Sequence, residues 1–267
     1  MTNAPILVGV DGSEPSLDAV SLAIREAARR GCAVRVVYGD PWAHHPAWAG
    51  KDTSGELTDG ELAIQAAAER AAAEQSDTDQ VPVTTEILAG DPAAVLIRES
   101  LSAEMVVVGH RGRGGFPTLL LGSVALKVAA HASCPVLVTR GTPRKQGEVV
   151  LGIDGAQPHE GAAEFAFREA ALHETSLRAL YAGPDPIELD AAVDALSRWT
   201  EKYPSVPLQS QHVLDRPDHA LIEASSQARL IVLGARLSRF RPGRRLGSVV
   251  NAVLHHAECP VAVLCQQ

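Results

Sequence analysis

The stretch MVVVGHRGRGGFPTLLLGSVALKVAAHASCPVLV, residues 105–138, returns near the other end of the chain as LIVLGARLSRFRPGRRLGSVVNAVLHHAECPVAVL, residues 230–264. In each copy a short apolar run leads through a loop into a helical pattern and then into a second apolar run. Self-similarity of this length indicates a duplicated domain, which has to be recognised before a fold is assigned.

The duplication extends to the first part of each copy. The segment ILVGVDGSEPSLDAVSLAIREAA from Ile6 returns as VVLGIDGAQPHEGAAEFAFREAA from Val149, and CAVRVVYGD from Cys32 returns as SLRALYAGPD from Ser176. Between the copies lies GTPRKQGE, residues 141–148, whose polar composition with Gly and Pro is typical of a linker. The 267 residues therefore form two domains of ordinary size, which we expect at residues 1–142 and 148–267.

Short runs of β-branched residues alternate with longer amphipathic runs in both copies. In the first copy the expected strands are residues 5–11, 33–39, 82–88, 104–109 and 135–140, and the expected helices are 14–30, 56–76, 91–102 and 122–132. The Asp91-Pro92 pair suits the N-cap and the first position of a helix. The strands are apolar throughout, as in a parallel sheet that is buried on both faces. The alternation predicts two tandem, doubly wound, Rossmann-like α/β domains, each a five-stranded parallel sheet flanked by helices.

Composition excludes several classes of protein. The net charge of -8 and the 4% of aromatic residues predict that no nucleic acid is bound, because such binding needs a basic surface and stacking platforms. No run of about 18 apolar residues is present, so no membrane partner is expected. The start MTNAPILVGVDGS lacks the pattern of a signal peptide. The four cysteines form no CxxC pair, which favours reduced, buried thiols and a cytoplasmic location.

The loop GHRGRGGFPTLLLGS, residues 109–123, carries the clearest functional signal. Its glycines permit a close backbone approach to an anion. Its final Gly-Ser pair opens the next helix, whose free N–H groups and dipole favour a phosphate. Arg111 and Arg113 add positive charge. A loop without a ligand, or a flexible turn, is the alternative, because a glycine pattern alone is a weak signal.

The loop is neither a Walker A motif nor a dinucleotide-binding fingerprint, because no GKS or GKT occurs and no GxGxxG follows the first strand. The spacing Gly109-x2-Gly112-x9-Gly122-Ser123 resembles the ATP-binding motif of the universal stress protein family. VGVDGS at the first strand, VVYGD at the second and HASCPVLV at the close of the domain add to a resemblance that covers nearly the whole chain, twice. It implies the adenine nucleotide alpha-hydrolase-like variant of the Rossmann-like fold.

The resemblance also implies which residues hold the nucleotide. An aspartate at the end of the first strand would contact the adenosine, and the backbone at the end of the second strand would meet the adenine. Two glycines of the loop would approach the ribose and the phosphates, which the start of the following helix would bind. The implied positions are Val10, Asp11, Gly39, Gly109, Gly112, Gly122, Ser123 and Val124. Taken alone, Asp11 has a second interpretation as a turn or N-cap residue.

The second copy departs from this motif. Asp154, Gly234, Gly247 and Ser248 stay in register, but Leu237 stands where the middle glycine would be. A leucine there would obstruct the path of the ribose or the phosphates. The loop also carries five arginines, which suit either an anion held by charge or a solvated basic rim: Arg236, Arg239, Arg241, Arg244 and Arg245. We expect the second site to be degenerate or a weaker binder.

The leading interpretation is an ATP-binding universal stress protein that acts as a nucleotide-dependent regulator in stress adaptation, with Mg²⁺ as a companion of the phosphates. No general base is evident in the sequence, so substantial turnover is not expected. Three alternatives stay open: a slow ATPase or phosphoryl-transfer enzyme, a nucleotide-independent protein-interaction module, and binding of AMP or cyclic AMP. In the family the final strands mediate domain pairing, which implies an intrachain pseudo-dimer and leaves a homodimer open.

Overall fold

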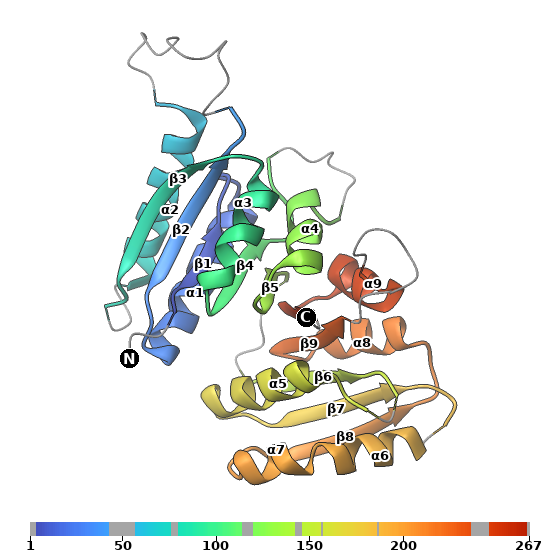
Figure 1. The fold of residues 1–267 in the computed structure, drawn as a ribbon. Coiled ribbons are helices and arrows are strands. Elements are labelled where there is room, and N and C mark those ends of the chain that lie inside the picture. The colour runs from blue at the N-terminus through green and yellow to red at the C-terminus, as the bar shows by residue number, and fades with distance from the viewer. Residues whose placement is uncertain are drawn as a thin grey trace. The chain divides into compact units, whose positions relative to one another are not determined.

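The computed structural model describes residues 4–42, 57–75, 80–113, 120–141, 146–155, 157–185, 187–235 and 246–265. The chain divides into two compact units, Met1–Thr139 and Arg140–Gln267 (Figure 1). In each unit strands and helices alternate along the chain, as the sequence predicts.

The N-terminal unit is built on the parallel strands β1 (Ile6–Gly9), β2 (Val34–Asp40), β3 (Val83–Ala89), β4 (Met105–Gly109) and β5 (Val136–Thr139). Their order is β3-β2-β1-β4-β5, so the chain starts in the middle of these strands, moves to one side and then crosses to the other. Ile6, Leu7 and Val8 are at most 1% exposed. Such complete burial of three consecutive strand residues, whose side chains point to alternate faces, requires cover on both faces of the sheet.

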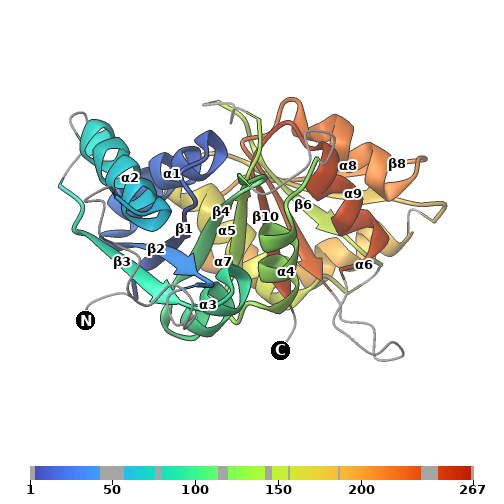
Figure 2. The same cartoon turned by 90° about the horizontal axis from the view of Figure 1, so that it is seen from above.

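The helices of this unit are α1 (Glu14–Arg30), α2 (Asp59–Gln75), α3 (Pro92–Glu99) and α4 (Ser123–His131), with a 3₁₀ turn η1 (Ser100–Ser102) after α3. α1 and α2 pack together on one face of the strands, whereas α3 and α4 pack together on the other (Figure 2). This two-sided cover is the doubly wound arrangement that the alternation of elements predicts.

Local signals in the sequence determine where these helices begin and end. α1 spans the residues that the sequence predicts: it begins after Ser13, has Pro15 in its first turn, and ends where Gly31 takes a left-handed φ of 61°. At α3 the predicted N-cap is confirmed, because Oδ1 of Asp91 accepts a 3.0 Å hydrogen bond from the N–H of Ala94.

The C-terminal unit repeats the arrangement with the strands β6 (Val149–Ile153), β7 (Leu177–Ala182), β8 (Leu208–Val213), β9 (Leu230–Ala235) and β10 (Val261–Cys265). They pair in parallel in the order β8-β7-β6-β9-β10. The helices are α5 (Glu160–Leu172), α6 (Ile187–Ala195), α7 (Ser197–Lys202), α8 (Pro217–Ser225) and α9 (Ser248–His256). The fold class that the sequence predicts, two tandem doubly wound α/β domains, is confirmed.

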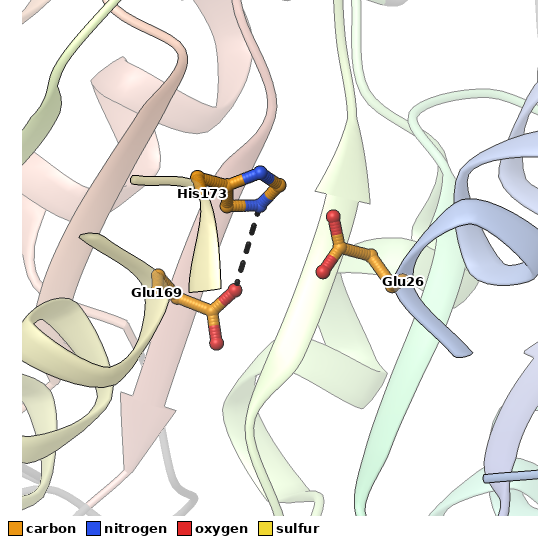
Figure 3. Close-up of side chains that lie close together, drawn as sticks. All are labelled: Glu26, Glu169 and His173. Atoms are coloured by element: carbon orange, nitrogen blue, oxygen red, sulfur yellow. Dashed lines mark ion pairs between the residues drawn. The ribbon is translucent and has the colours of Figure 1, made fainter. Parts of the chain in front are cut away.

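Each unit buries a glutamate at the same repeat position of its first helix, Glu26 on α1 and Glu169 on α5 (Figure 3). Glu26 forms ion pairs with Arg29, at 3.6 Å, and with Arg30 on the same helix. Oε2 of Glu169 lies 4.0 Å from Nε2 of His173, one turn further along. Such partners offset the loss of hydration of a buried carboxylate. The two glutamates are therefore part of the helical framework of their units.

Two expectations drawn from composition can be compared with the structure. The cysteines are free, but only Cys32 and Cys259 are buried, so the expectation of buried thiols is wrong for Cys134 and Cys265, which are partly exposed. Loss of hydration raises the pKa of both Cys134 and Cys259 to about 12, which keeps these thiols protonated. Among the residues that the structure describes, no helix combines the length and the apolar character that a membrane crossing needs.

Phe167 fills the core of the C-terminal unit: it is fully buried, and its ring centroid lies 6.1 Å from that of Tyr203. We predict that Phe167→Ala lowers the free energy of unfolding by about 3–5 kcal/mol, because it leaves a cavity in a close-packed core. Urea denaturation followed by circular dichroism measures the loss. Leu214→Ala, at a side chain that is 80% exposed, is the control and should change the free energy by less than about 0.5 kcal/mol. Equal effects of the two substitutions would contradict this placement of Phe167.

Candidate functional site

A cavity of about 580 Å³ lies at the carboxyl ends of β1, β2 and β4 in the N-terminal unit. Ligands of doubly wound sheets bind at this edge, where the strand order reverses, and here the order reverses at β1. All the N-terminal positions that the resemblance implies lie in the wall of this cavity. They are Val10, Asp11, Gly39, Gly109, Gly112, Gly122, Ser123 and Val124. The structure thus brings these residues together, and their role as nucleotide ligands stays a prediction.

Asp11 lies just past the end of β1, and its carboxylate joins two loops. Oδ1 accepts hydrogen bonds from the N–H of Ser13 at 3.0 Å and from the Ser13 hydroxyl at 2.6 Å. Oδ2 accepts the N–H of Arg113, in the glycine-rich loop, at 2.7 Å. Ser13 is the N-cap of α1, so the N-cap interpretation of Asp11 is wrong, whereas its bond to Ser13 does form a turn.

Close contacts, rather than unusual backbone angles, require glycine at two positions of the loop. A Cβ on Gly109 would lie 2.6 Å from the carbonyl oxygen of Pro15, at the start of α1. A Cβ on Gly112 would lie 2.1 Å from Oδ2 of Asp11. Neither glycine has a positive φ. A side chain at either position would therefore force the backbone of α1 or the carboxylate of Asp11 to move.

The start of α4 lies in the wall of the cavity. Gly122 is the N-cap, and its own N–H donates to the carbonyl oxygen of His110 at 2.7 Å, which closes the glycine-rich loop. The first helical hydrogen bond runs from the N–H of Leu126 to the carbonyl oxygen of Gly122. The N–H groups of residues 123–125 therefore have no partner within the helix, and all three residues line the cavity. The helix dipole makes this end favourable for an anion.

The opposite part of the cavity is largely apolar and is formed where β2 continues beyond β1. The last pairing of β1 is Gly9 with Val37, and the N–H of Val10 donates to the carbonyl oxygen of Val37 at 3.0 Å. Because backbone groups point to alternate sides along a strand, Gly39 presents its N–H and C=O to the same side as Val37, past the end of β1. A Cβ on Gly39 would lie 2.6 Å from Cα of Pro92. The slot is lined by Val37, Tyr38, Gly39, Pro41, Pro92, Leu96 and Val108.

The two arginines of the glycine-rich loop have different surroundings. Arg111 lines the cavity. Arg113 is bound through its backbone to Asp11, and its guanidinium passes over Gly12 and lies 3.7 Å from Asp59 at the start of α2. The sequence alone treats the two arginines as equivalent. The structure places Arg111 in the wall of the cavity and ties Arg113 to the neighbouring elements.

Several cavity residues were missed by the sequence reasoning. Pro15 and Ser16 come from the first turn of α1, whereas Pro92 and Leu96 come from α3. A helical pattern marks such apolar side chains as buried, but it does not distinguish a side chain that lines a cavity from one that fills the core. The available signal is the position of these residues in the fold: the helices that follow β1, β3 and β4 begin at the carboxyl edge of the sheet, where ligands of doubly wound sheets bind.

In the C-terminal unit the structure describes Asp154, Gly234, Gly247 and Ser248. Leu237 and the arginines at 236, 239, 241, 244 and 245 lie outside the described residues. Gly247 is the N-cap of α9 and Ser248 is its first residue, so this helix begins at the place that the repeat indicates. Gly234 lies in β9, at the position of Gly109 in β4.

Two further differences in the C-terminal unit were not identified from the sequence. His159 stands in the place of Ser16 and is the N-cap of α5, where its Nδ1 accepts the N–H of Ala162 at 3.1 Å. A Cβ on Gly234 would lie 2.2 Å from Cβ of His159, so the imidazole is packed against the end of β9. Ala182 stands in the place of Gly39. The positions of Ser16 and Gly39, which line the cavity of the first unit, therefore carry different side chains in the second unit.

Comparisons with known proteins agree on one family. The model of the universal stress protein family matches residues 2–140 and 185–264. A universal stress protein of Mycobacterium tuberculosis (strain H37Rv) is 34% identical over 301 residues, which cover 98% of this chain and 95% of the relative. One from Mycolicibacterium smegmatis is 33% identical and covers 98% and 97%. The crystal structure of a universal stress protein from Archaeoglobus fulgidus has a TM-score of 0.69 over 100% of both chains, a likeness of fold at 18% identity.

The contacts of two glycines predict different costs of adding a methyl group. Gly109→Ala should lower the free energy of unfolding by about 1–3 kcal/mol, because its Cβ would overlap the backbone at Pro15. Gly122→Ala should cost less than about 1 kcal/mol, because its Cβ would be 3.5 Å from Arg111 and His110 and its φ of -78° suits any residue. Urea denaturation of both variants checks this, and a larger loss for Gly122→Ala would contradict the contacts described here.

Proposed function

The chain belongs to the universal stress protein family, and we propose that its N-terminal unit binds an adenine nucleotide, with ATP as the first candidate, as a regulator in stress adaptation. Family membership supports the role in the stress response. The observation that carries nucleotide binding is one cavity with two chemically different ends. An apolar slot with a free strand edge lies at one end, and a helix N-terminus with a glycine-rich loop lies at the other.

The slot suits a purine base. Val37, Pro92 and Leu96 provide apolar surfaces for the faces of a ring. The N–H and C=O of Gly39 form a donor and acceptor pair beside them, which matches the N1 acceptor and the 6-amino donor of adenine. Guanine reverses this donor and acceptor pattern at the same edge. Adenine is therefore the base that the strand edge supports.

The opposite end suits phosphate groups. The N–H groups of residues 123–125 point out of the start of α4, and Arg111 adds a positive charge to the same wall. A hydrogen bond to a charged oxygen contributes about 1.5–3 kcal/mol, so a few of them with base burial are enough for a micromolar dissociation constant. Among the described residues that line the cavity, Asp11 alone carries a carboxylate. Mg²⁺ that accompanies ATP would accordingly be held mainly by phosphate oxygens and water.

The lining favours binding over turnover. Both carboxylate oxygens of Asp11 already accept hydrogen bonds from Ser13 and Arg113. A general base has to reach the attacking water with a free acceptor, and no histidine or lysine is found among the described lining residues. We therefore propose a nucleotide-binding regulator, and hydrolysis of ATP is an outcome that the experiment below detects.

We predict that the purified protein carries or takes up about one ATP per chain. The nucleotide is released by denaturation and identified and counted by mass spectrometry. Gly122→Val should reduce ATP affinity at least tenfold, because its branched side chain would narrow the entrance to the N–H groups of residues 123–125. Gly247→Val changes the equivalent N-cap of α9 and is the matched control, which should leave the count unchanged.

Each result of this experiment distinguishes between the alternatives. Two nucleotides per chain, one of them lost in Gly247→Val, would show that the second unit also binds. Recovery of ADP after incubation with ATP would favour an ATPase. Failure of ATP, AMP and cyclic AMP to bind at millimolar concentration would rule out the proposed function and leave the protein-interaction module.

A further inference from the structure

We infer that Asp11 is a positioning residue: its carboxylate fixes the glycine-rich loop in the shape that receives the nucleotide. The inference extends the proposed function, and the nucleotide-binding experiments that test it rest on that function. This role is additional to the adenosine contact that the family resemblance implies for Asp11.

The hydrogen bonds of Asp11 support this role. Oδ2 accepts a 2.7 Å hydrogen bond from the N–H of Arg113, which lies 102 positions further along the sequence. Oδ1 is bound by the N–H and the hydroxyl of Ser13, which fix the carboxylate at the end of β1. A charged acceptor with three donors is held firmly in one orientation. The carboxylate thus clamps the loop after β4 to the turn after β1.

Glycine at position 112 leaves the space that the carboxylate of Asp11 occupies. Its φ is not positive, so glycine is not required there by the backbone conformation. It is required by space, because a Cβ would come within 2.1 Å of Oδ2 of Asp11. The absence of a side chain at this position is what lets the carboxylate reach the next N–H, that of Arg113. The glycine of the motif and the aspartate therefore act as one pair.

The rest of the loop is consistent with a clamp that acts on the ligand indirectly. The guanidinium of Arg113 reaches Asp59 at 3.7 Å, which adds a second tie on the same side of the loop. The carbonyl oxygen of His110 accepts the N–H of Gly122 at 2.7 Å, which ties the other side to the start of α4. Arg111, between the two ties, is left facing the cavity.

Hydrogen–deuterium exchange on the full-length protein without ligand tests the clamp. Asp11→Ala should speed exchange of the Arg113 amide at least tenfold, because its acceptor is gone. Asp18→Ala, which removes an exposed carboxylate of α1 that pairs with Arg70, is the matched control and should leave this amide unchanged. Asp11→Asn keeps one carbonyl acceptor and the size of the side chain, and should give a smaller increase. Unchanged exchange in both Asp11 variants would overturn the inference.

Isothermal titration measures the effect of the clamp on the ligand. Asp11→Ala should weaken ATP binding about tenfold or more, because the loop is no longer held by the carboxylate, and Asp11→Asn should weaken it less. Unchanged affinity in Asp11→Ala would overturn the inference.

A double-mutant cycle tests the pairing of Asp11 with Gly112. Gly112→Ala should weaken ATP binding about tenfold or more in the wild-type background and less than threefold in Asp11→Ala, because the carboxylate that its Cβ would strike is then absent. Additive losses would overturn the inference. If the wild-type protein bound none of the nucleotides, the proposed function would fail, and the exchange experiment would still decide whether Asp11 clamps the loop.

Discussion

The candidate site depends on one constraint: a parallel sheet with helices on both faces leaves backbone polar groups unpaired mainly where its strands end. In the N-terminal unit β1 ends at Gly9, whereas β2 beside it runs on to Asp40. This difference in length leaves one side of Gly39 without a strand neighbour. A ligand with a hydrogen-bond donor and an acceptor in the plane of the sheet could bond to the C=O and N–H of Gly39, in the place that a longer β1 would occupy.

The second half of the site follows from the same geometry. The chain leaves β4 next to β1, and its return to the sheet requires a helix whose N-terminus lies at the carboxyl edge. That helix is α4, and Gly122 at its N-cap leaves three N–H groups directed to the cavity. Strand ends and a helix end therefore meet in one place, so one cavity is lined both by the exposed edge of β2 and by the N–H groups at the start of α4.

Much of this could be predicted from the sequence. The start and end of α1 were predicted correctly, because Ser13, Pro15 and Gly31 are strong local signals. Gly109, Gly112 and Gly122 were found because their spacing resembles a family motif, whereas Gly9, which also lines the cavity, was not identified. The contacts of Asp11 with Arg113, and of Arg113 with Asp59, could not be found in the same way. They join segments far apart in the chain, and neither spacing nor periodicity encodes which charged side chain reaches which backbone group.

A comparison of the two units indicates which glycines of the loop are required for packing of the fold and which are not. Gly109 packs against the start of α1, and its counterpart Gly234 packs against His159 at the start of α5, so a helix turn next to the strand explains both. The nearest neighbour of a Cβ on Gly112 would be the carboxylate of Asp11, in the turn after β1, and the second copy has Leu237 in place of this glycine. A doubly wound domain can form without glycine at that position, since α9 and β9 are both present in the second unit. Glycine at position 112 is therefore not a requirement of the fold, and the close contact with Asp11 accounts for it in the first unit.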